Sequence, residues 1–182
     1  MKIVLNTNCL LEDNNSEMTY VVEEQKIISL NKFILLSIIS FGLYEIWWTY
    51  KAWGFFNQKE KLYVNPAIRT IFSIIFLIPL FNKILRFAKE KGYNDSYPSI
   101  LLFVGVFVVN FLAYLPNPFW LIALLGFVFF ILPFKALNFA KRNSTDFIVT
   151  EQTSYNGRQI ALIVIGGIFW ALVLLGLIIL YL

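Results

Sequence analysis

Two long stretches of the sequence contain no charged residue. The first, 96–134, has 39 residues without an acid or a base, and the second, 159–182, has 24. About 20 apolar residues are enough to cross a bilayer as a helix. Composition agrees, because 59% of the residues are hydrophobic and 14% are charged, against about 45–50% and about 25% in an average soluble domain. The chain is therefore expected to be an integral membrane protein.

Five apolar segments follow one another along the chain. They cover residues 31–50, 67–85, 97–115, 119–137 and 159–182. This pattern predicts an all-α, polytopic helical membrane protein with four to five membrane segments. The last three segments are long enough to span a bilayer without help.

The first two segments are shorter between their charges. Their uncharged cores are 33–44, with 12 residues, and 70–82, with 13. Runs of about 10–14 apolar residues are typical of interfacial or re-entrant segments, whereas snorkelling of long basic side chains permits a full span. Both arrangements stay open, and Gly42 and Pro79 are the expected positions of a kink or break.

The N-terminal part of the chain has a different character. The first 31 residues hold two lysines and five acids, a net charge of −3. Because the whole chain has a net charge of +4, the remaining residues carry +7. We therefore expect an acidic tail at 1–27 and a helical membrane domain at 28–182. Within the tail, Met18 is a second potential start codon, and a start there would make 1–17 an optional extension; both starts stay open. The stretch 19–30 is expected to hold a short strand or the start of a helix.

Basic residues indicate which ends of the segments face the cytoplasm. KILRFAK at 83–89 and KALNFAK at 135–141 end the second and fourth segments, whereas the PNP turn at 116–118 has no charge. This turn is therefore expected outside, and the fifth segment then carries Leu182 to the external side of the cell inner membrane. Specific contact with anionic lipid headgroups competes with ordinary positive-inside flanking as the reason for the basic residues. The candidates for headgroup contact are Lys83, Arg86, Lys89, Lys135, Lys141 and Arg142.

The loop at 51–66 does not fit a plain five-span topology. It contains Lys51, Lys59 and Lys61, and five full spans would put these lysines outside, against the positive-inside rule. A re-entrant second segment would return the loop to the cytoplasm.

Glu45 is the one carboxylate within the five apolar segments. It lies in FGLYEIWWTYKAW, in which Trp47, Trp48 and Trp53 have the composition of an interfacial aromatic belt. We expect Glu45 at headgroup level, where a neighbouring threonine or lysine provides a local partner. The alternative is an intramembrane carboxylate that relays protons or binds a cation.

Small and polar residues of the later segments predict helix packing. Asn110 is expected to form a hydrogen bond to a neighbouring helix, with substrate contact as the alternative. Gly166 or Gly167, together with Ala171, is expected to allow close approach of a helix, within the chain or between copies.

The sequence offers little for catalysis. Histidine is absent and Cys9 is the single cysteine, so neither a Cys/His zinc set nor an intramolecular disulfide is possible within the chain. No P-loop, G-x-S-x-G or HExxH motif occurs. We therefore expect no catalytic residues, no cofactor and no metal. The basic residues flank apolar segments, so we expect membrane lipids as partners and no nucleic acid.

Four stretches together resemble a known family. FGLYEIWWTYKAW, NPAIRTIFSIIF, LPNPFWLIALLGFVFFILPFKALN and SYNGRQIALIVIGGIFWALVLLGL are similar to successive landmarks of a family of small bacterial inner-membrane proteins with an FGLY…W…YK.W signature in the first segment. The resemblance covers roughly residues 20–180. It implies a bacterial membrane location and a shared fold, and because the family has no established activity it assigns no site residues.

Three functional hypotheses follow. The leading one is a non-enzymatic membrane protein that acts by interaction with other membrane components, as an accessory, scaffold or immunity-type protein, whose partner is another membrane protein or a second copy of itself. The second is a small oligomeric transporter or channel that uses Glu45. The third is a lipid-modifying membrane enzyme.

Overall fold

The computed structural model describes residues 24–60 and 65–181. Most of these residues are helical, as predicted, and two very short strands are added to the all-α expectation. The elements are β1 (Gln25–Ile27), α1 (Leu30–Ile39), α2 (Leu43–Glu60), α3 (Pro66–Ile71), α4 (Ser73–Glu90), α5 (Ser99–Phe111), η1 (Leu112–Tyr114), η2 (Phe119–Phe127), α6 (Val128–Arg142), β2 (Val149–Glu151) and α7 (Gly157–Tyr181). The expectations for residues 1–23 and for Lys61 fall outside the described residues.

The first apolar segment forms a helical hairpin instead of one helix. Ser29 caps α1 by accepting from the backbone N–H of Lys32. After ten residues the chain reverses at Phe41 and Gly42, whose φ angles are 54° and 85°. Only glycine adopts such positive φ values readily, so the predicted break at Gly42 is confirmed. The chain then returns as α2 to the level of β1.

The second segment is broken at a different residue from the one expected. Asn65 caps α3, the helix ends at Phe72, and α4 then runs through Pro79 without interruption. Of the two alternatives expected at Pro79, a kink or a break, the break does not occur. Lys83 of α4 forms a salt bridge with Glu60, so α4 turns back toward the end of α2.

The remaining segments are helical close to the expected bounds. α5 and η1 lead to the PNP turn, which contains a cis Asn117–Pro118 peptide, and η2 continues directly into α6. Among the described residues, two helices are long and apolar enough to cross a membrane by length and composition. These are Phe119–Arg142, formed by η2 and α6, and Gly157–Leu180 within α7.

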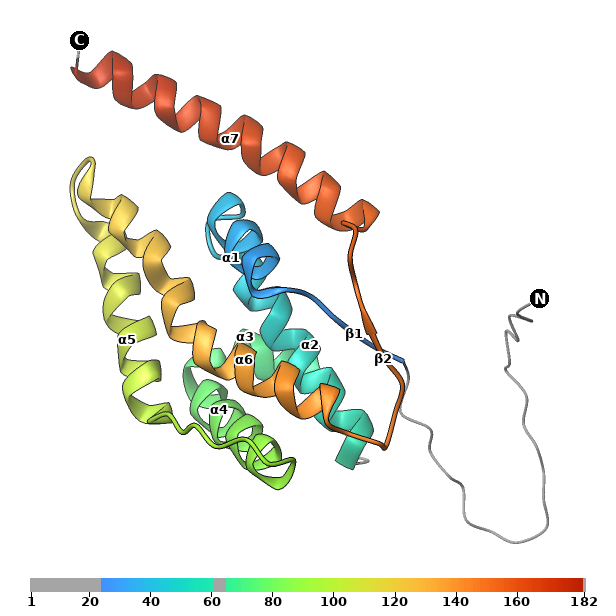
Figure 1. The fold of residues 1–182 in the computed structure, drawn as a ribbon. Helices are drawn as coiled ribbons and strands as arrows, with labels where there is room; N and C mark the ends of the chain where they lie inside the picture. Colours follow the sequence, from blue (N-terminus) through green and yellow to red (C-terminus); the bar gives the residue numbers. More distant parts are fainter. Residues whose placement is uncertain (1–23, 61–64, 182) are drawn as a thin grey trace, which may run out of the picture.

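A parallel pair of strands joins the beginning and the end of the fold. Gln25 pairs with Val149, and Ile27 pairs with Glu151. Each strand leads into an apolar helix, β1 into α1 and β2 into α7, so the pair aligns the starts of these helices (Figure 1). A short strand in this stretch was one of the two expectations. Ile27 of β1 is buried against the rest of the fold.

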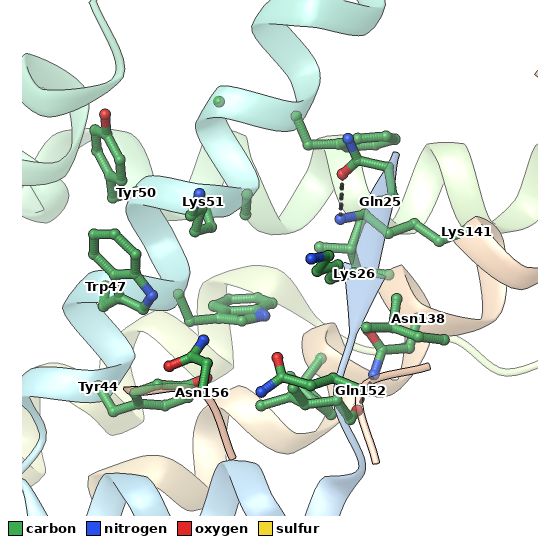
Figure 2. Close-up of a pocket in the computed structure, with 18 of the residues that line it drawn as sticks. Gln25, Lys26, Tyr44, Trp47, Tyr50, Lys51, Asn138, Lys141, Gln152 and Asn156 are labelled. Atoms are coloured by element: carbon green, nitrogen blue, oxygen red, sulfur yellow. Dashed lines mark hydrogen bonds between the residues drawn. The ribbon is translucent and has the colours of Figure 1, made fainter. Parts of the chain in front are cut away.

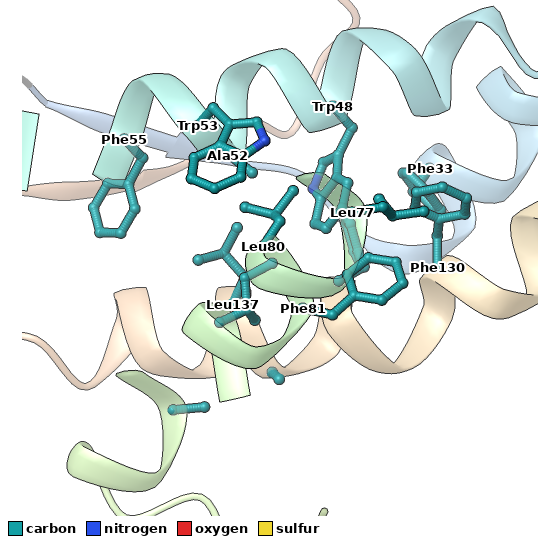
Figure 3. Close-up of a cluster of buried hydrophobic side chains, with 14 of the residues drawn as sticks. Phe33, Trp48, Ala52, Trp53, Phe55, Leu77, Leu80, Phe81, Phe130 and Leu137 are labelled. Atoms are coloured by element: carbon teal, nitrogen blue, oxygen red, sulfur yellow. The ribbon is translucent and has the colours of Figure 1, made fainter. Parts of the chain in front are cut away.

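The hydrophobic core lies between α2, α4 and α6, with α1 closing one side (Figure 3). Phe33 of α1 is completely buried and stacks on Phe134 of α6, with 4.4 Å between ring centroids. Trp48 and Trp53 project from α2 into the same core. Two of the three tryptophans assigned to an aromatic belt are therefore core residues.

Charged residues collect at one end of the bundle, which we call the basic end. It comprises the two strands and the C-terminal ends of α2, α4 and α6, whereas the PNP turn and the end of α7 lie at the opposite end (Figure 1). Arg142 pairs with Glu151 at 2.7 Å, and Lys91 pairs with Asp146 at 3.3 Å. The Ser144 hydroxyl, and then Lys91, hold the pKa of Asp146 below its usual range.

Candidate functional site

A large cavity opens at the basic end. It has a volume of about 840 Å³ and lies between α2, α6, β1 and the start of α7. Figure 2 shows Trp47 and Lys51 projecting from α2, opposite Asn138 and Lys141 of α6, with Lys26 of β1 between them. Parts of the sequence more than 100 residues apart therefore form one site.

The charge of this cavity is positive. Four basic side chains line it, and Glu24 is the one acidic residue among the described lining residues. The four are Lys26, Lys51, Lys141 and Arg158. Within the described part of the chain, none of the four forms a salt bridge. An anion would meet four cations whose charges are not already balanced by a neighbour.

Lys141 is the most enclosed of these cations, with 8% of its surface exposed. Its ammonium group donates to the side-chain oxygen of Gln25 at 3.0 Å and lies 4.4 Å from the ring centroid of Phe55. A cation over an aromatic face is stabilised by the ring quadrupole. Neither of these two partners carries a negative charge, so neither balances the charge of the Lys141 ammonium group.

Amide side chains form a connected network along the opposite wall. Asn156 caps α7 by accepting from the backbone of Gln159, and Gln159 accepts in return from the backbone N–H of Asn156. This reciprocal arrangement is a capping box. Gln159 also accepts from Gln152 at 2.6 Å and donates to the hydroxyl of Tyr44 at 3.3 Å. The network fixes the start of α7 against α2.

The aromatic residues of the signature divide between cavity and core. Trp47 is 40% exposed and lines the cavity, where Lys51 lies 5.3 Å from its ring centroid and Tyr50 stacks on it. Trp48 is 8% exposed and Trp53 is 3% exposed. Trp48 still lines the cavity with Trp47 and Tyr50, whereas Trp53 lies in the core.

The six predicted headgroup contacts have different environments. Lys141 lines the cavity, Lys83 is paired with Glu60, and Arg142 is paired with Glu151. Lys89 donates to the carbonyl oxygen of Asn94. Arg86 and Lys135 are exposed. Lys141 is therefore the one predicted contact that the fold brings into this site.

Glu45 and Asn110 lie in a second, smaller cavity on the other side of α2. Glu45 follows directly after the hairpin turn, away from the basic end, whereas Lys51 lines the cavity at the basic end. Asn110 donates to Val106 in its own helix at 2.8 Å, and the expected bond to a neighbouring helix is not the one observed.

Of the two glycines of α7 that were expected to allow close helix packing, one is at a close contact. A Cβ atom at Gly166 would lie 2.4 Å from the carbonyl oxygen of Ile39, whereas a Cβ at Gly167 would meet nothing within 4 Å. Gly166 therefore permits α1 and α7 to approach closely within the chain.

Several residues of the basic cavity were not predicted as site residues. Lys26, Lys51 and Arg158 belong to three different elements, and their convergence depends on the strand pair and on the hairpin. The capping box of Asn156 and Gln159 was readable as N-x-x-Q before an apolar run. Among the described residues, no group of three potential metal ligands from His, Cys, Asp and Glu gathers.

Comparison with known proteins assigns neither a family nor a function to this chain. The chain matches no protein-family model, no curated protein and no solved structure. The resemblance to the bacterial family with the FGLY signature stays a prediction.

Proposed function

We propose that this protein is a non-enzymatic protein of the bacterial inner membrane that binds an anionic phospholipid in the cavity at its basic end. The observation that carries the proposal is the convergence of four basic side chains, without a salt bridge in the described part of the chain, on one cavity of about 840 Å³. A headgroup phosphate complements this charge, and basic pockets between membrane helices bind anionic lipid headgroups in other proteins.

The walls of the cavity suit an amphiphile. Lys26, Lys51 and the amide network provide polar contacts, while Phe134, Leu137 and Leu162 provide an apolar surface. A phospholipid joins an anionic phosphate to acyl chains and matches both kinds of wall. A soluble anion would use only the polar part of the site.

The proposed membrane position puts the basic end in the cytoplasm. α5 and the η2–α6 helix then form a hairpin through the bilayer, and α7 carries the C-terminus to the external side. The α1–α2 turn lies beside the middle of α7, because Phe41 stacks on Trp170 with 4.8 Å between ring centroids. α1 has ten residues and a length of about 15 Å, about half of a hydrocarbon core of about 30 Å. We therefore propose that α1–α2 is re-entrant, with both of its ends on the cytoplasmic side. α3–α4 is proposed to be re-entrant too, so that Lys51 and Lys59 lie on the cytoplasmic side.

The test is phospholipid binding to a variant with two cavity lysines neutralised. Each basic residue near an anionic surface contributes about 1 kcal/mol, so Lys51→Gln combined with Lys141→Gln is expected to weaken binding of phosphatidylglycerol by about 30-fold. Native mass spectrometry of the purified protein measures the binding. Glutamine keeps a donor for Gln25 at position 141, which limits the effect on folding.

Lys135→Gln is the matched control, because Lys135 is an exposed lysine on the same helix as Lys141. The proposal predicts unchanged lipid binding for this variant. Equal losses in both variants would mean that binding is general electrostatic attraction. Displacement of the lipid by inorganic phosphate alone would indicate a soluble anion as the ligand.

A small transporter or channel is the second candidate function. The observation in its favour is the second cavity, where a carboxylate lies beside two helix breaks, an arrangement that ion sites of transporters use.

A further inference from the structure

The second cavity has a volume of about 410 Å³ and lies between two interruptions of the helices. The α1–α2 turn contributes Phe41 and Gly42, and the break between α3 and α4 contributes Thr70 and Ser73. The 3₁₀ segment η2 forms another part of the wall through Gly126. Interrupted helices at membrane depth are tolerated where they line such a cavity.

Glu45 is the one charged side chain among the described residues that line this cavity. Its two carboxylate oxygens lie 3.9 Å and 3.7 Å from where Cβ atoms would stand at Gly42 and Gly126. The carboxylate thus lies close to the backbone at two glycines, where no side chain intervenes. Arg69, on the helix that carries Thr70, stacks on Trp53 instead, with its guanidinium carbon 4.4 Å from the ring centroid.

Three polar neighbours of Glu45 donate within their own helices and not to the carboxylate. Thr49, Thr70 and Asn110 each donate to the carbonyl oxygen four residues earlier in their own helix, at 2.8–2.9 Å. The indole N–H of Trp120 donates to Asn117 at 2.8 Å. The hydroxyl and amide oxygens of the first three residues still have lone pairs to offer. The cavity therefore presents acceptor oxygens around a carboxylate, and this set complements a positive charge.

We propose that this cavity binds a small monovalent cation of the sodium class, with the Glu45 carboxylate as its charged ligand. Oxygen ligands from carboxylates, hydroxyls and amides suit hard cations. One carboxylate balances one positive charge, which favours a monovalent ion over a divalent one. A bound cation also compensates a carboxylate that has no salt bridge in the described part of the chain.

The cation site is independent of the phospholipid site. α2 separates the two cavities: Trp47 and Lys51 line the first, whereas Glu45 and Thr49 line the second. Loss of one kind of binding is therefore expected without loss of the other.

Thermal unfolding of the full-length protein in detergent tests the proposal. The Tm in sodium chloride is compared with the Tm in N-methyl-D-glucamine chloride at equal ionic strength. A ligand that binds only the folded state raises the Tm, by about 3–6 °C for a chain of this size when sodium is at about ten times its Kd. Glu45→Gln is expected to abolish this shift, and direct binding of radioactive sodium should show the same loss.

Two further variants keep the test decisive. Glu90→Gln makes the same chemical change at an exposed helix end and should retain the sodium-dependent shift. Asn110→Ala removes one acceptor oxygen at an exposed residue and should weaken sodium binding even if Glu45→Gln does not fold. Absence of a sodium-specific shift in the native protein, or unchanged binding in Glu45→Gln or Asn110→Ala, would overturn the proposal.

Discussion

Alanine at Gly166 is expected to separate α7 from α1 and to lower the Tm by about 3–10 °C. The added methyl group would lie 2.4 Å from the carbonyl oxygen of Ile39, and that atom belongs to the backbone, so no rotamer change relieves the overlap. Forcing extra volume into a close contact costs about 1–3 kcal/mol, and each kcal/mol moves the Tm by about 2–4 °C for a chain of this size. The indole N–H of Trp170, which donates to Ile38 at 3.2 Å, would lose its partner.

Gly167→Ala is the control for this substitution. Gly167 is the next residue of the same helix, and a Cβ atom there would meet nothing within 4 Å. Because alanine favours a helix over glycine by about 1 kcal/mol, this variant is expected to be as stable as the native protein or more so. Thermal unfolding of both variants in the same detergent is the measurement, and equal Tm values would contradict the close packing of α1 on α7.

Phe33→Ala is expected to destabilise the hairpin by about 3–5 kcal/mol, the usual cost of truncating a buried phenylalanine. Phe33 is completely buried and contacts three aromatic rings. Its ring centroid lies 6.0 Å from those of Tyr44 and Trp48 and 4.4 Å from that of Phe134. The side chain joins α1 to α2 and α6, so its loss leaves a cavity at the junction of three helices.

Phe119→Ala gives the matched comparison, because Phe119 is 56% exposed at the start of η2. The same change of side chain there should have little effect on the free energy of unfolding. Reversible denaturation in detergent measures both variants, and a small effect at Phe33 would mean that α1 is not held in the core.

Local patterns predicted the apolar helices and the glycine turn, but they did not predict the second helix break. Pro79 is the local signal in that segment, yet the helix breaks at Phe72. Trp53 contacts both sides of this break, through the Arg69 guanidinium in α3 and the Phe76 ring in α4. Such contacts depend on tertiary packing that a single segment does not encode.

The spacing of the aromatic signature indicates the environment of its residues better than its composition does. Tyr44, Trp48, Ala52 and Phe56 recur every fourth residue and form the buried face of α2. This spacing is that of an amphipathic helix, and it indicates a helix packed in a core. Trp47, between two of these positions, faces the cavity.

The basic cavity could be predicted only in part. Lys141 was a candidate because it ends an apolar segment, but Lys26 and Arg158 reach it through the pairing of β1 with β2. A parallel pair of three-residue strands 122 or more residues apart in sequence gives almost no local signal. The site therefore became visible only when the helical hairpin and the strand pair were known.

The most direct test of this account is the side of the membrane on which α2 ends. In a Cys9→Ser background, single cysteines at Gln58, Thr145 and Tyr114 report on the end of α2, on the turn after α6 and on the PNP end. A membrane-impermeant thiol reagent should label Tyr114→Cys in intact cells, and should label Gln58→Cys and Thr145→Cys only after permeabilisation. Labelling of Gln58→Cys in intact cells while Thr145→Cys stays protected would show that the first segment crosses the membrane, and would contradict the re-entrant hairpin and the cytoplasmic cavity.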